Sequence, residues 1–337
     1  MGDKEILKAA VVFADRFFMS AEALAAIRPL GGFVWADATD DQDLAKKLEG
    51  ASNVQVLVSE YIPVTARVYK KVQGLKGVIA YGAGYDHIDL TGAARQGVIV
   101  CNCRGENAQA VAEFTFGILL CLMRKIHLAD RYIREGGWGR TDPASLPDWV
   151  AGAELKGKTL GIIGLGQIGY RVARIARGFG MRNLAYDPFA LPPEVNPPAA
   201  EKTTWEQLIQ EADIITLHVP LTPATEKMIN SQTLERMKPG IWLVNTSRGR
   251  VIDEPALLEA LKKKRIAGAA LDVFAREPIS GDHPFAKLEN VILSPHLGAI
   301  TQEAGERLSA SVARQVREIL EGQTPECVIP QPGSVRP

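Results

Sequence analysis

The chain has 337 residues, with 39 basic and 39 acidic side chains and a formal net charge of zero. At about 150 residues per domain this length predicts two domains, and the balanced charge argues against a nucleic-acid or membrane-surface partner. No apolar run reaches the about 18 residues of a membrane span, and Met1–Glu5 carries both charge signs without the pattern of a signal sequence. We therefore expect a cytoplasmic protein whose partner is a small molecule.

The first 100 residues alternate short apolar runs with helical segments. The runs cover 9–13, 33–35, 54–58, 78–80 and 98–100, and helical patterns lie between them, as at 41–49 and 63–71. Apolar runs that are bounded by turns and separated by helices are typical of parallel strands buried on both faces. The pattern predicts a first α/β domain with a parallel sheet.

The longest apolar helical stretch spans 108–133, and we interpret it as one helix that connects two halves of the chain. Beyond it the alternation restarts. Strands are predicted at 159–163, 183–186, 214–217, 241–244, 267–271 and 291–293. A final helical segment over 302–320 follows the last strand, and we interpret it as returning to the first half. The fold class predicted is therefore α/β, with two doubly wound parallel-sheet domains.

The four cysteines are Cys101, Cys103, Cys121 and Cys327. The side chains of Cys101 and Cys103 would alternate between the faces of a strand rather than close a metal-binding loop. We therefore expect reduced, buried thiols and no metal site.

A glycine-rich turn follows the strand predicted at 159–163. It reads Gly164-Leu165-Gly166-Gln167-Ile168-Gly169 and precedes a helical stretch, which is the strand-turn-helix setting of a dinucleotide site. The first two glycines permit a tight turn and the close approach of a pyrophosphate to backbone N–H groups, and Gly169 lets the helix lie close to the strand. The cofactor contacts predicted here are Gly164, Gly166, Gln167, Ile168 and Gly169.

Asp187 ends the next apolar run, near the spacing of about 20 residues at which an acid binds the ribose of a dinucleotide. Its carboxylate can accept a hydrogen bond from the ribose 2′-OH and would repel a 2′-phosphate. No Arg or Lys follows it directly, since the next residues are Pro188-Phe189-Ala190. The sequence favours NAD over NADP.

Three charged or titratable residues follow predicted strands of the second half. Arg248 lies in Asn245-Thr246-Ser247-Arg248-Gly249, and its guanidinium can hold a carboxylate by two parallel hydrogen bonds. His296 lies in Ser294-Pro295-His296-Leu297-Gly298, and imidazole is the usual proton shuttle near neutral pH. Glu277 precedes Pro278. Taken alone, Arg248 and Glu277 are equally compatible with ordinary surface residues.

These segments, together with Leu271-Asp272-Val273-Phe274, resemble the D-isomer-specific 2-hydroxyacid dehydrogenases in order and spacing, over nearly the whole chain. The resemblance implies a Rossmann NAD-binding domain at 107–299, inserted in a flavodoxin-like substrate domain formed by 1–106 and 300–337. It also implies a homodimer built mainly on the nucleotide domain. By motif match, Arg248 would bind and polarise the 2-oxo acid, His296 would be the general acid/base, and Glu277 would pair with His296.

The resemblance implies further contacts. Asp272 would lie by the nicotinamide carboxamide, and Pro220 and Thr246 would line the cofactor cleft. The turn that begins Tyr81-Gly82-Ala83-Gly84 matches the family's glycine loop, so the N–H groups of Ala83 and Gly84 would hold the substrate carboxylate.

The chain departs from the family pattern at two places. It reads Cys103-Arg104 where members commonly have a small residue and Pro before the Gly, and Gln109 replaces a small hydroxyl residue. Substrate preference is expected to differ accordingly. The residues suspected of shaping the substrate pocket are Tyr61, Ile62, Tyr85, Arg104 and Trp138, and each is equally compatible with ordinary packing or an ordinary surface position.

The function predicted is NAD-dependent interconversion of a small D-2-hydroxy acid and its 2-oxo acid, with glyoxylate, hydroxypyruvate or 3-phosphoglycerate as candidates. Formate dehydrogenases resemble the family but have glutamine at the position of Glu277. One alternative is an NAD-sensing corepressor with little turnover. Another is a hydrolase or lyase that retains NAD as a fixed redox cofactor.

Overall fold

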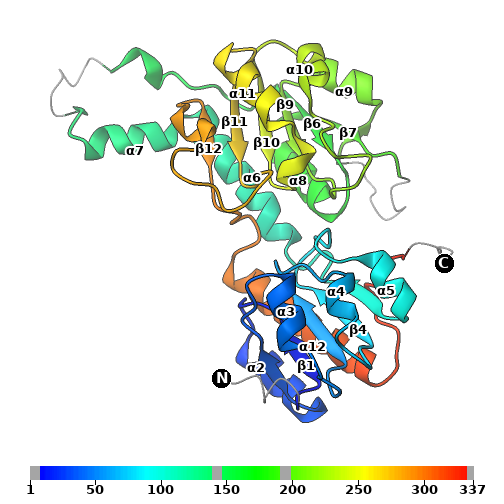
Figure 1. The fold of residues 1–337 in the computed structure, drawn as a ribbon. Coiled ribbons are helices and arrows are strands. Elements are labelled where there is room, and N and C mark those ends of the chain that lie inside the picture. The colour runs from blue at the N-terminus through cyan, green and yellow to red at the C-terminus, as the bar shows by residue number, and fades with distance from the viewer. Residues whose placement is uncertain (1–7, 139–145, 190–198, 332–337) are drawn as a thin grey trace. The chain divides into compact units, whose positions relative to one another are not determined.

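The computed structural model describes residues 8–138, 146–189 and 199–331 (Figure 1). The expectations about Met1–Glu5 therefore lie outside the described residues. The chain divides into two compact units, one formed by Met1–Asn107 with Ala299–Pro337 and the other by Ala108–Gly298. The second unit is thus an insertion in the chain of the first.

Unit 1 contains a five-stranded parallel sheet in the order β2-β1-β3-β4-β5. The strands are β1 (Val11–Phe13), β2 (Phe33–Trp35), β3 (Val56–Ser59), β4 (Gly77–Ala80) and β5 (Ile99–Asn102). This is the doubly wound order of flavodoxin-like folds. The central strands are buried throughout, as expected for strands covered on both faces.

The α-helices of unit 1 begin at polar N-cap residues. They are α2 (Ala21–Ile27), α3 (Asp41–Lys47), α4 (Ala66–Tyr69), α5 (Leu90–Gln96) and α12 (Gln302–Leu320), and the short 3-10 helix η1 (Arg28–Leu30) continues directly from α2. The last of these, α12, packs against α2, β3 and β4. A Cβ on Gly77 would lie 2.6 Å from Cδ1 of Ile319, so the glycine permits this close packing. The C-terminal helix therefore completes the core of a unit whose strands come from the first third of the chain.

Unit 2 contains a seven-stranded parallel sheet in the order β12-β11-β10-β9-β6-β7-β8. The strands are β6 (Thr159–Ile163), β7 (Arg182–Tyr186), β8 (Glu201–Lys202), β9 (Ile214–Leu217), β10 (Ile241–Asn245), β11 (Ile266–Leu271) and β12 (Val291–Leu293). Renumbered within the unit, this is the Rossmann order with one added edge strand. The predicted fold class is confirmed.

The helices of unit 2 flank this sheet. They are α6 (Ala108–Met123), α7 (Ile126–Arg134), η3 (Asp148–Val150), α8 (Gln167–Gly178), α9 (Trp205–Glu211), α10 (Ser231–Arg236), η4 (Gly249–Val251), α11 (Glu254–Lys262) and η5 (Pro284–Lys287). Of these, α6 packs against α8 and also against β10, β11 and β12. None of the helices in the described part of the chain is long and apolar enough to cross a membrane.

The prediction of one helix over 108–133 is wrong. Helix α6 ends at Met123, Lys125 adopts a left-handed φ of 54°, and α7 begins at Ile126. The carbonyl of Met123 accepts the N–H of Ala153 at 3.1 Å instead of continuing the helical ladder. A bond from a segment about 30 residues further on therefore ends the helix, and the local pattern does not show it.

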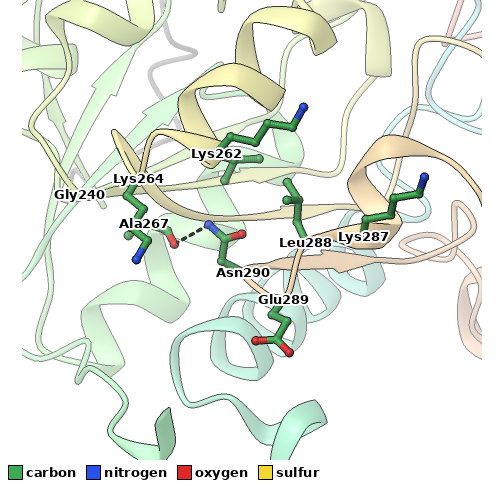
Figure 2. Close-up of a pocket in the computed structure, with 9 residues that line it drawn as sticks. Gly240, Lys262, Lys264, Ala267, Lys287, Leu288, Glu289 and Asn290 are labelled. Atoms are coloured by element: carbon green, nitrogen blue, oxygen red, sulfur yellow. Dashed lines mark hydrogen bonds between the residues drawn. The ribbon is translucent and has the colours of Figure 1, made fainter. Parts of the chain in front are cut away.

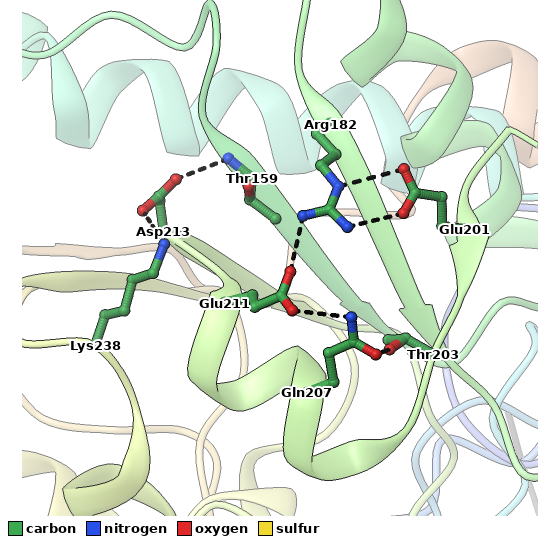
Figure 3. A network of polar contacts seen from close by, with 8 residues as sticks. All are labelled: Thr159, Arg182, Glu201, Thr203, Gln207, Glu211, Asp213 and Lys238. Atoms are coloured by element: carbon green, nitrogen blue, oxygen red, sulfur yellow. Dashed lines mark hydrogen bonds and ion pairs between the residues drawn. The ribbon is translucent and has the colours of Figure 1, made fainter.

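Exposed ion pairs surround the short edge strand β8, which the sequence pattern did not predict and which pairs with β7 in the sheet. Figure 3 shows the Arg182 guanidinium between Glu201 of β8 and Glu211 at the end of α9, at 2.9 Å and 2.8 Å. Nearby, Asp213 accepts the N–H of Thr159 and the ammonium of Lys238, both at 2.8 Å. These contacts lie at the amino ends of the strands. Since the partners are exposed, each pair contributes little to stability.

The four cysteines are all free thiols. Cys101 and Cys103 are buried as expected, and burial raises the pKa of Cys101 to about 12 and that of Cys103 to about 11. Cys121 and Cys327 are only half-buried, which corrects the expectation for these two. The described residues contain no cluster of three or more His, Cys, Asp or Glu arranged to hold a metal ion.

Candidate active site

The glycine-rich turn after β6 admits no side chain at two of its three glycines. Gly164 has a φ of 90°, and a Cβ there would lie 2.6 Å from the carbonyl oxygen of His218. A Cβ on Gly169 would lie 2.1 Å from the carbonyl oxygen of Gly164. At Gly166, in contrast, a Cβ would meet no atom within 4 Å. The turn is therefore tight where strand and helix meet and open where a ligand would approach.

The open position coincides with the start of a helix. Helix α8 begins at Gln167, and its N-cap Gly166 has no side chain to accept the first N–H groups. The first-turn N–H groups, which include those of Ile168 and Gly169, have no partner within a helix. Together with the helix dipole they form a site for an anion, which fits the pyrophosphate of a dinucleotide.

Asp187 lies directly after β7, beside the glycine turn. Its Oδ2 accepts the N–H of Leu165 at 2.9 Å, and its Oδ1 accepts the N–H of Phe189 at 3.0 Å. These bonds fix the carboxylate at the edge of the turn. A carboxylate held there suits the hydroxyl groups of a ribose and disfavours an added phosphate.

Arg248 lies in a turn that the side chain of Asn245 holds in shape. Oδ1 of Asn245 accepts the N–H of Ser247 at 3.0 Å and its hydroxyl at 2.8 Å, and Nδ2 donates to the carbonyl of Arg248 at 2.9 Å. A Cβ on Gly249 would lie 1.8 Å from the carbonyl carbon of Phe274, so this turn lies directly against the segment after β11. The half-buried Arg248 is thereby set next to the segment that carries Glu277.

The loop that carries His296 is held by the buried side chain of Asp272 at the end of β11. Its Oδ1 accepts the Ser294 hydroxyl at 2.7 Å and the N–H of Leu297 at 2.8 Å, and its Oδ2 accepts the N–H of Gly298 at 2.8 Å. Burial raises the pKa of Asp272, although these bonds favour the carboxylate. Asp272 also accepts the N–H of His296 at its own carbonyl, at 2.9 Å.

His296 and Glu277 form a hydrogen-bonded pair. Nδ1 of His296 lies 2.8 Å from Oε2 of Glu277, and the two side chains are 29% and 31% exposed. Oε1 of Glu277 accepts the N–H of Phe274 at 2.8 Å. Burial alone would raise the pKa of Glu277, but these two hydrogen bonds and the charge of Arg248 hold it below its usual value. Glu277 is therefore a carboxylate at neutral pH, and it orients the imidazole.

Comparison with known proteins identifies the family. Residues 116–298 match the family model described as "D-isomer specific 2-hydroxyacid dehydrogenase, NAD binding domain". The chain belongs to the D-isomer-specific 2-hydroxyacid dehydrogenases. A glyoxylate reductase of Korarchaeum cryptofilum is 41% identical over 295 residues, which are 87% of this chain and 88% of that protein. The resemblance inferred from the motifs is confirmed.

Two further relatives show the breadth of the family. A D-3-phosphoglycerate dehydrogenase of Synechocystis is 39% identical over 278 residues, which are 82% of this chain but 49% of that protein. A solved D-lactate dehydrogenase of Aquifex aeolicus, complexed with NAD and lactic acid, is 27% identical with a TM-score of 0.80, covering 93% of this chain and 96% of that chain. This protein is accordingly an NAD-dependent 2-hydroxyacid dehydrogenase.

The other residues predicted to contact the cofactor or the substrate lie in two different units. In unit 2, the hydroxyl of Thr246 lies 3.1 Å from that of Thr115 in α6, and the exposed Pro220 follows β9. Ala83 and Gly84 belong to unit 1, where they follow β4 and are partly exposed. The structure thus brings Arg248, Glu277 and His296 together within unit 2.

Among the residues suspected of shaping the substrate pocket, Ile62 is a packing residue of the core of unit 1, with 8% of its surface exposed. Tyr61 and Trp138 are each 52% exposed, Arg104 is exposed, and Tyr85 packs partly against the core. Gln109 donates to Glu113 on the exposed side of α6, at 2.6 Å.

A surface pocket of about 600 Å³ lies at the opposite edge of the NAD-binding sheet (Figure 2). Its lining includes Gly240 before β10, Ala267 in β11 and Asn290 before β12, which are all at the amino ends of the strands. Figure 2 shows the Lys264 side chain pointing away from those of Lys262 and Lys287, so the three ammonium groups do not converge on one point. Ligands of doubly wound folds bind at the carboxyl ends, so this pocket is not the active site.

Sequence reasoning missed three residues that shape the site. Asn245 holds the turn of Arg248, and Ser294 helps to hold the loop of His296. Thr115 of α6, which precedes Thr246 by 131 residues in the chain, lies within hydrogen-bond distance of its hydroxyl. Asn245 and Ser294 stood inside the motifs that were singled out, so a polar residue at a buried strand end was an available signal. Nothing in the sequence pointed to Thr115.

Proposed function

We propose that this dehydrogenase reduces a small 2-oxo acid, with glyoxylate as the first candidate, and uses NADH in preference to NADPH. The observation that carries the proposal is the His296–Glu277 pair, held at 2.8 Å in the unit that carries Arg248 and the glycine-rich turn. The relative with 41% identity over most of its length is named glyoxylate reductase, which supports glyoxylate. The carboxylate of Asp187 beside the turn supports NADH.

In this proposal different residues bind the cofactor, bind the substrate and transfer the proton. The glycine turn and Asp187 hold the dinucleotide, whose reduced form supplies a hydride when it is bound. Arg248 binds the 2-oxo acid through its planar guanidinium and stabilises negative charge that develops on the 2-oxo oxygen. Because Nδ1 of His296 is engaged by Glu277, Nε2 transfers the proton to that oxygen in reduction and takes it back in oxidation.

We further propose that unit 1 is the substrate domain, with boundaries near 106 and 300. The N–H groups of Ala83 and Gly84 hold the substrate carboxylate, while Asp272, Thr246 and Pro220 line the cofactor site. Besides lining the cofactor site, the Asp272 side chain accepts three hydrogen bonds that fix the loop of His296. Its contact with the nicotinamide carboxamide remains a prediction from the resemblance.

The experiment that tests the proposed function is the initial rate of NADH oxidation across a panel of 2-oxo acids from glyoxylate to phosphohydroxypyruvate, with NADPH in parallel. We expect turnover of one small acid with NADH and a lower kcat/KM with NADPH. Tight NADH binding without turnover of any acid would favour the sensor alternative. Preference for phosphohydroxypyruvate would keep the reaction class and replace glyoxylate as the substrate.

Glu277→Gln is expected to lower kcat for reduction by about 10- to 100-fold, which corresponds to the loss of a hydrogen bond to a charged group. Oε2 of Glu277 lies 2.8 Å from Nδ1 of His296, and the neutral amide would no longer offer the ring a charged acceptor that fixes its orientation. Steady-state kcat at saturating NADH measures this loss. Glu254→Gln is the matched control, because Glu254 accepts the N–H of Ala275 rather than contacting His296. A wild-type kcat in Glu277→Gln would contradict the orienting role of Glu277.

We also propose a homodimer formed through α7. This helix has no buried residue, and Ile126 and Ile133, which are seven residues apart on one face, are 53% and 56% exposed. We expect sedimentation to give twice the mass of one chain and Ile126→Glu with Ile133→Glu to give a monomer. Ile300→Glu, at a residue that is 65% exposed outside α7, is the control. A wild-type protein that sediments as a monomer contradicts the proposal.

A further inference from the structure

The glycine loop after β4 turns two successive carbonyl groups toward one neighbouring segment. The carbonyl of Gly82 accepts the N–H of Cys103 at 2.8 Å, and the carbonyl of Ala83 accepts Nδ2 of Asn102 at 2.8 Å. Gly82 has a φ of 124°, which a residue with a side chain rarely adopts. The loop is therefore held at both carbonyls by the end of β5.

A trans peptide places its C=O and its N–H on opposite sides. Because the Gly82 and Ala83 carbonyls face the end of β5, the next N–H groups, those of Ala83 and Gly84, face away from it on one side. Neither N–H meets an acceptor among the residues that the structure describes, and both residues are partly exposed. Two adjacent N–H donors on one side form a concavity that suits an anion such as a carboxylate.

Asn102 is itself fixed from three directions. Its backbone N–H donates to the carbonyl of Cys327 at 3.2 Å, and its carbonyl accepts Nε2 of Gln315 at 3.1 Å. Gln315 is a buried residue of α12, and it also donates to Ser311 at 3.1 Å. The side chain of Asn102 is buried as well, so its amide has one orientation in which to meet the glycine loop. A buried amide that donates to a carbonyl is costly to replace by a group that cannot donate.

We propose that Asn102 is a positioning residue for substrate binding: its side-chain amide sets the peptide between Ala83 and Gly84 so that both N–H groups face the substrate carboxylate. This inference rests on the proposed function of the glycine loop. Only the Ala83 carbonyl depends on a side chain, because the Gly82 carbonyl is held by a backbone N–H. Loss of the amide therefore frees one peptide, and with it the N–H of Gly84, while the rest of the loop stays anchored.

The kinetic test compares Asn102→Asp and Asn102→Ala with the wild-type enzyme, using the 2-oxo acid that the enzyme turns over fastest. We expect KM for that acid to rise about 10- to 100-fold, the loss of a hydrogen bond to a charged group, with kcat within about threefold because the carboxylate is bound equally before and during the reaction. The Kd of NADH stays unchanged. Asn290→Ala removes a bond of the same type, to the carbonyl of Ala267 at 3.2 Å, and is expected to leave KM unchanged.

A second measurement reports on the loop without turnover. The backbone amide resonances of Ala83 and Gly84 are followed in ¹⁵N-labelled protein with NADH bound, during titration with oxamate, an unreactive analogue of a 2-oxo acid. We expect both resonances to shift in the wild-type protein and the Gly84 shift to require at least about tenfold more oxamate in Asn102→Asp.

The outcomes separate the two proposals. If no 2-oxo acid is turned over but the resonances shift and depend on Asn102, the proposed function fails and the positioning role stands. If the acid is turned over but the Asn102 variants keep the wild-type KM, the positioning role fails alone. If the amide resonances of Ala83 and Gly84 in the wild-type protein do not shift with oxamate, the positioning role is overturned as well. Variants in which KM and the Kd of NADH rise together, with a lowered Tm, show a structural role only and also overturn it.

Discussion

Replacing His296 with asparagine is expected to lower kcat for 2-oxo acid reduction by about 10²- to 10⁴-fold, with the Kd of NADH unchanged. The imidazole of His296 lies 2.8 Å from Glu277 and can exchange a proton near neutral pH. Asparagine has no proton to transfer in that range. Steady-state rates at saturating NADH and a fluorescence titration of NADH binding measure the two quantities separately.

Asparagine is the suitable replacement because of the backbone at this position. His296 has a φ of 56°, in the left-handed region that asparagine tolerates better than most residues. His283→Asn is the matched control: His283 is the N-cap of η5, and asparagine is also a good N-cap. We expect that variant to retain wild-type kcat. A His296→Asn enzyme within about tenfold of wild-type kcat would remove His296 from the role of proton donor.

Much of the fold could be predicted because most of its strands are apolar and largely buried. Four of them, β2, β6, β9 and β12, begin and end where the apolar runs do, and seven others match within two residues. Such runs need no knowledge of distant contacts, since burial on both faces leaves a continuous apolar sequence. The missed strand, β8, is Glu201–Lys202, two polar residues of which Glu201 pairs with Arg182, and a pattern of apolar residues does not report ion pairs.

The sequence pointed to the candidate residues of the site, but not to the hydrogen bonds that hold them in place. Arg248, Glu277 and His296 were visible because each follows a strand end within a recognisable motif. Their fixation depends on contacts between segments: Asp272 reaches three groups of the His296 loop from another strand, and Asn102 reaches the glycine loop across 19 residues. Such bonds follow from register and sheet order, which one strand's sequence does not encode.

Arg248→Lys is expected to reduce kcat/KM for the 2-oxo acid by about 10²- to 10³-fold, although the positive charge remains. A guanidinium offers a planar fork that binds a carboxylate through two parallel hydrogen bonds, whereas an ammonium offers a single point of attachment. One nitrogen, Nη1, already donates to the carbonyl of Ser247 at 2.8 Å, which holds the plane of the group in place. Lysine in that turn would have neither the fork nor the anchor.

Charge and geometry at this position can be separated by the pH profile. The charge of Arg248 is one of the contributions that lower the pKa of Glu277, a carboxylate that must be ionised to orient His296. Arg248→Met removes the charge, so the pKa of Glu277 moves up and the acid limb of kcat/KM moves to higher pH. Arg248→Lys keeps the charge, and its acid limb should stay near that of the wild-type enzyme despite the loss of rate.

The control for both variants is Arg250→Lys, two residues along the same turn. Arg250 is exposed and pairs with Glu226 at 2.7 Å, so its substitution keeps a surface ion pair and should leave kcat/KM within about threefold of wild type. If Arg248→Lys behaves like that control, the fork is not what binds the acid. Arg248→Lys could also lose rate while its acid limb moves to higher pH, as in Arg248→Met. The lysine charge would then have no effect on the pKa of Glu277, and the proposal that residue 248 lies next to Glu277 in the active site would be refuted.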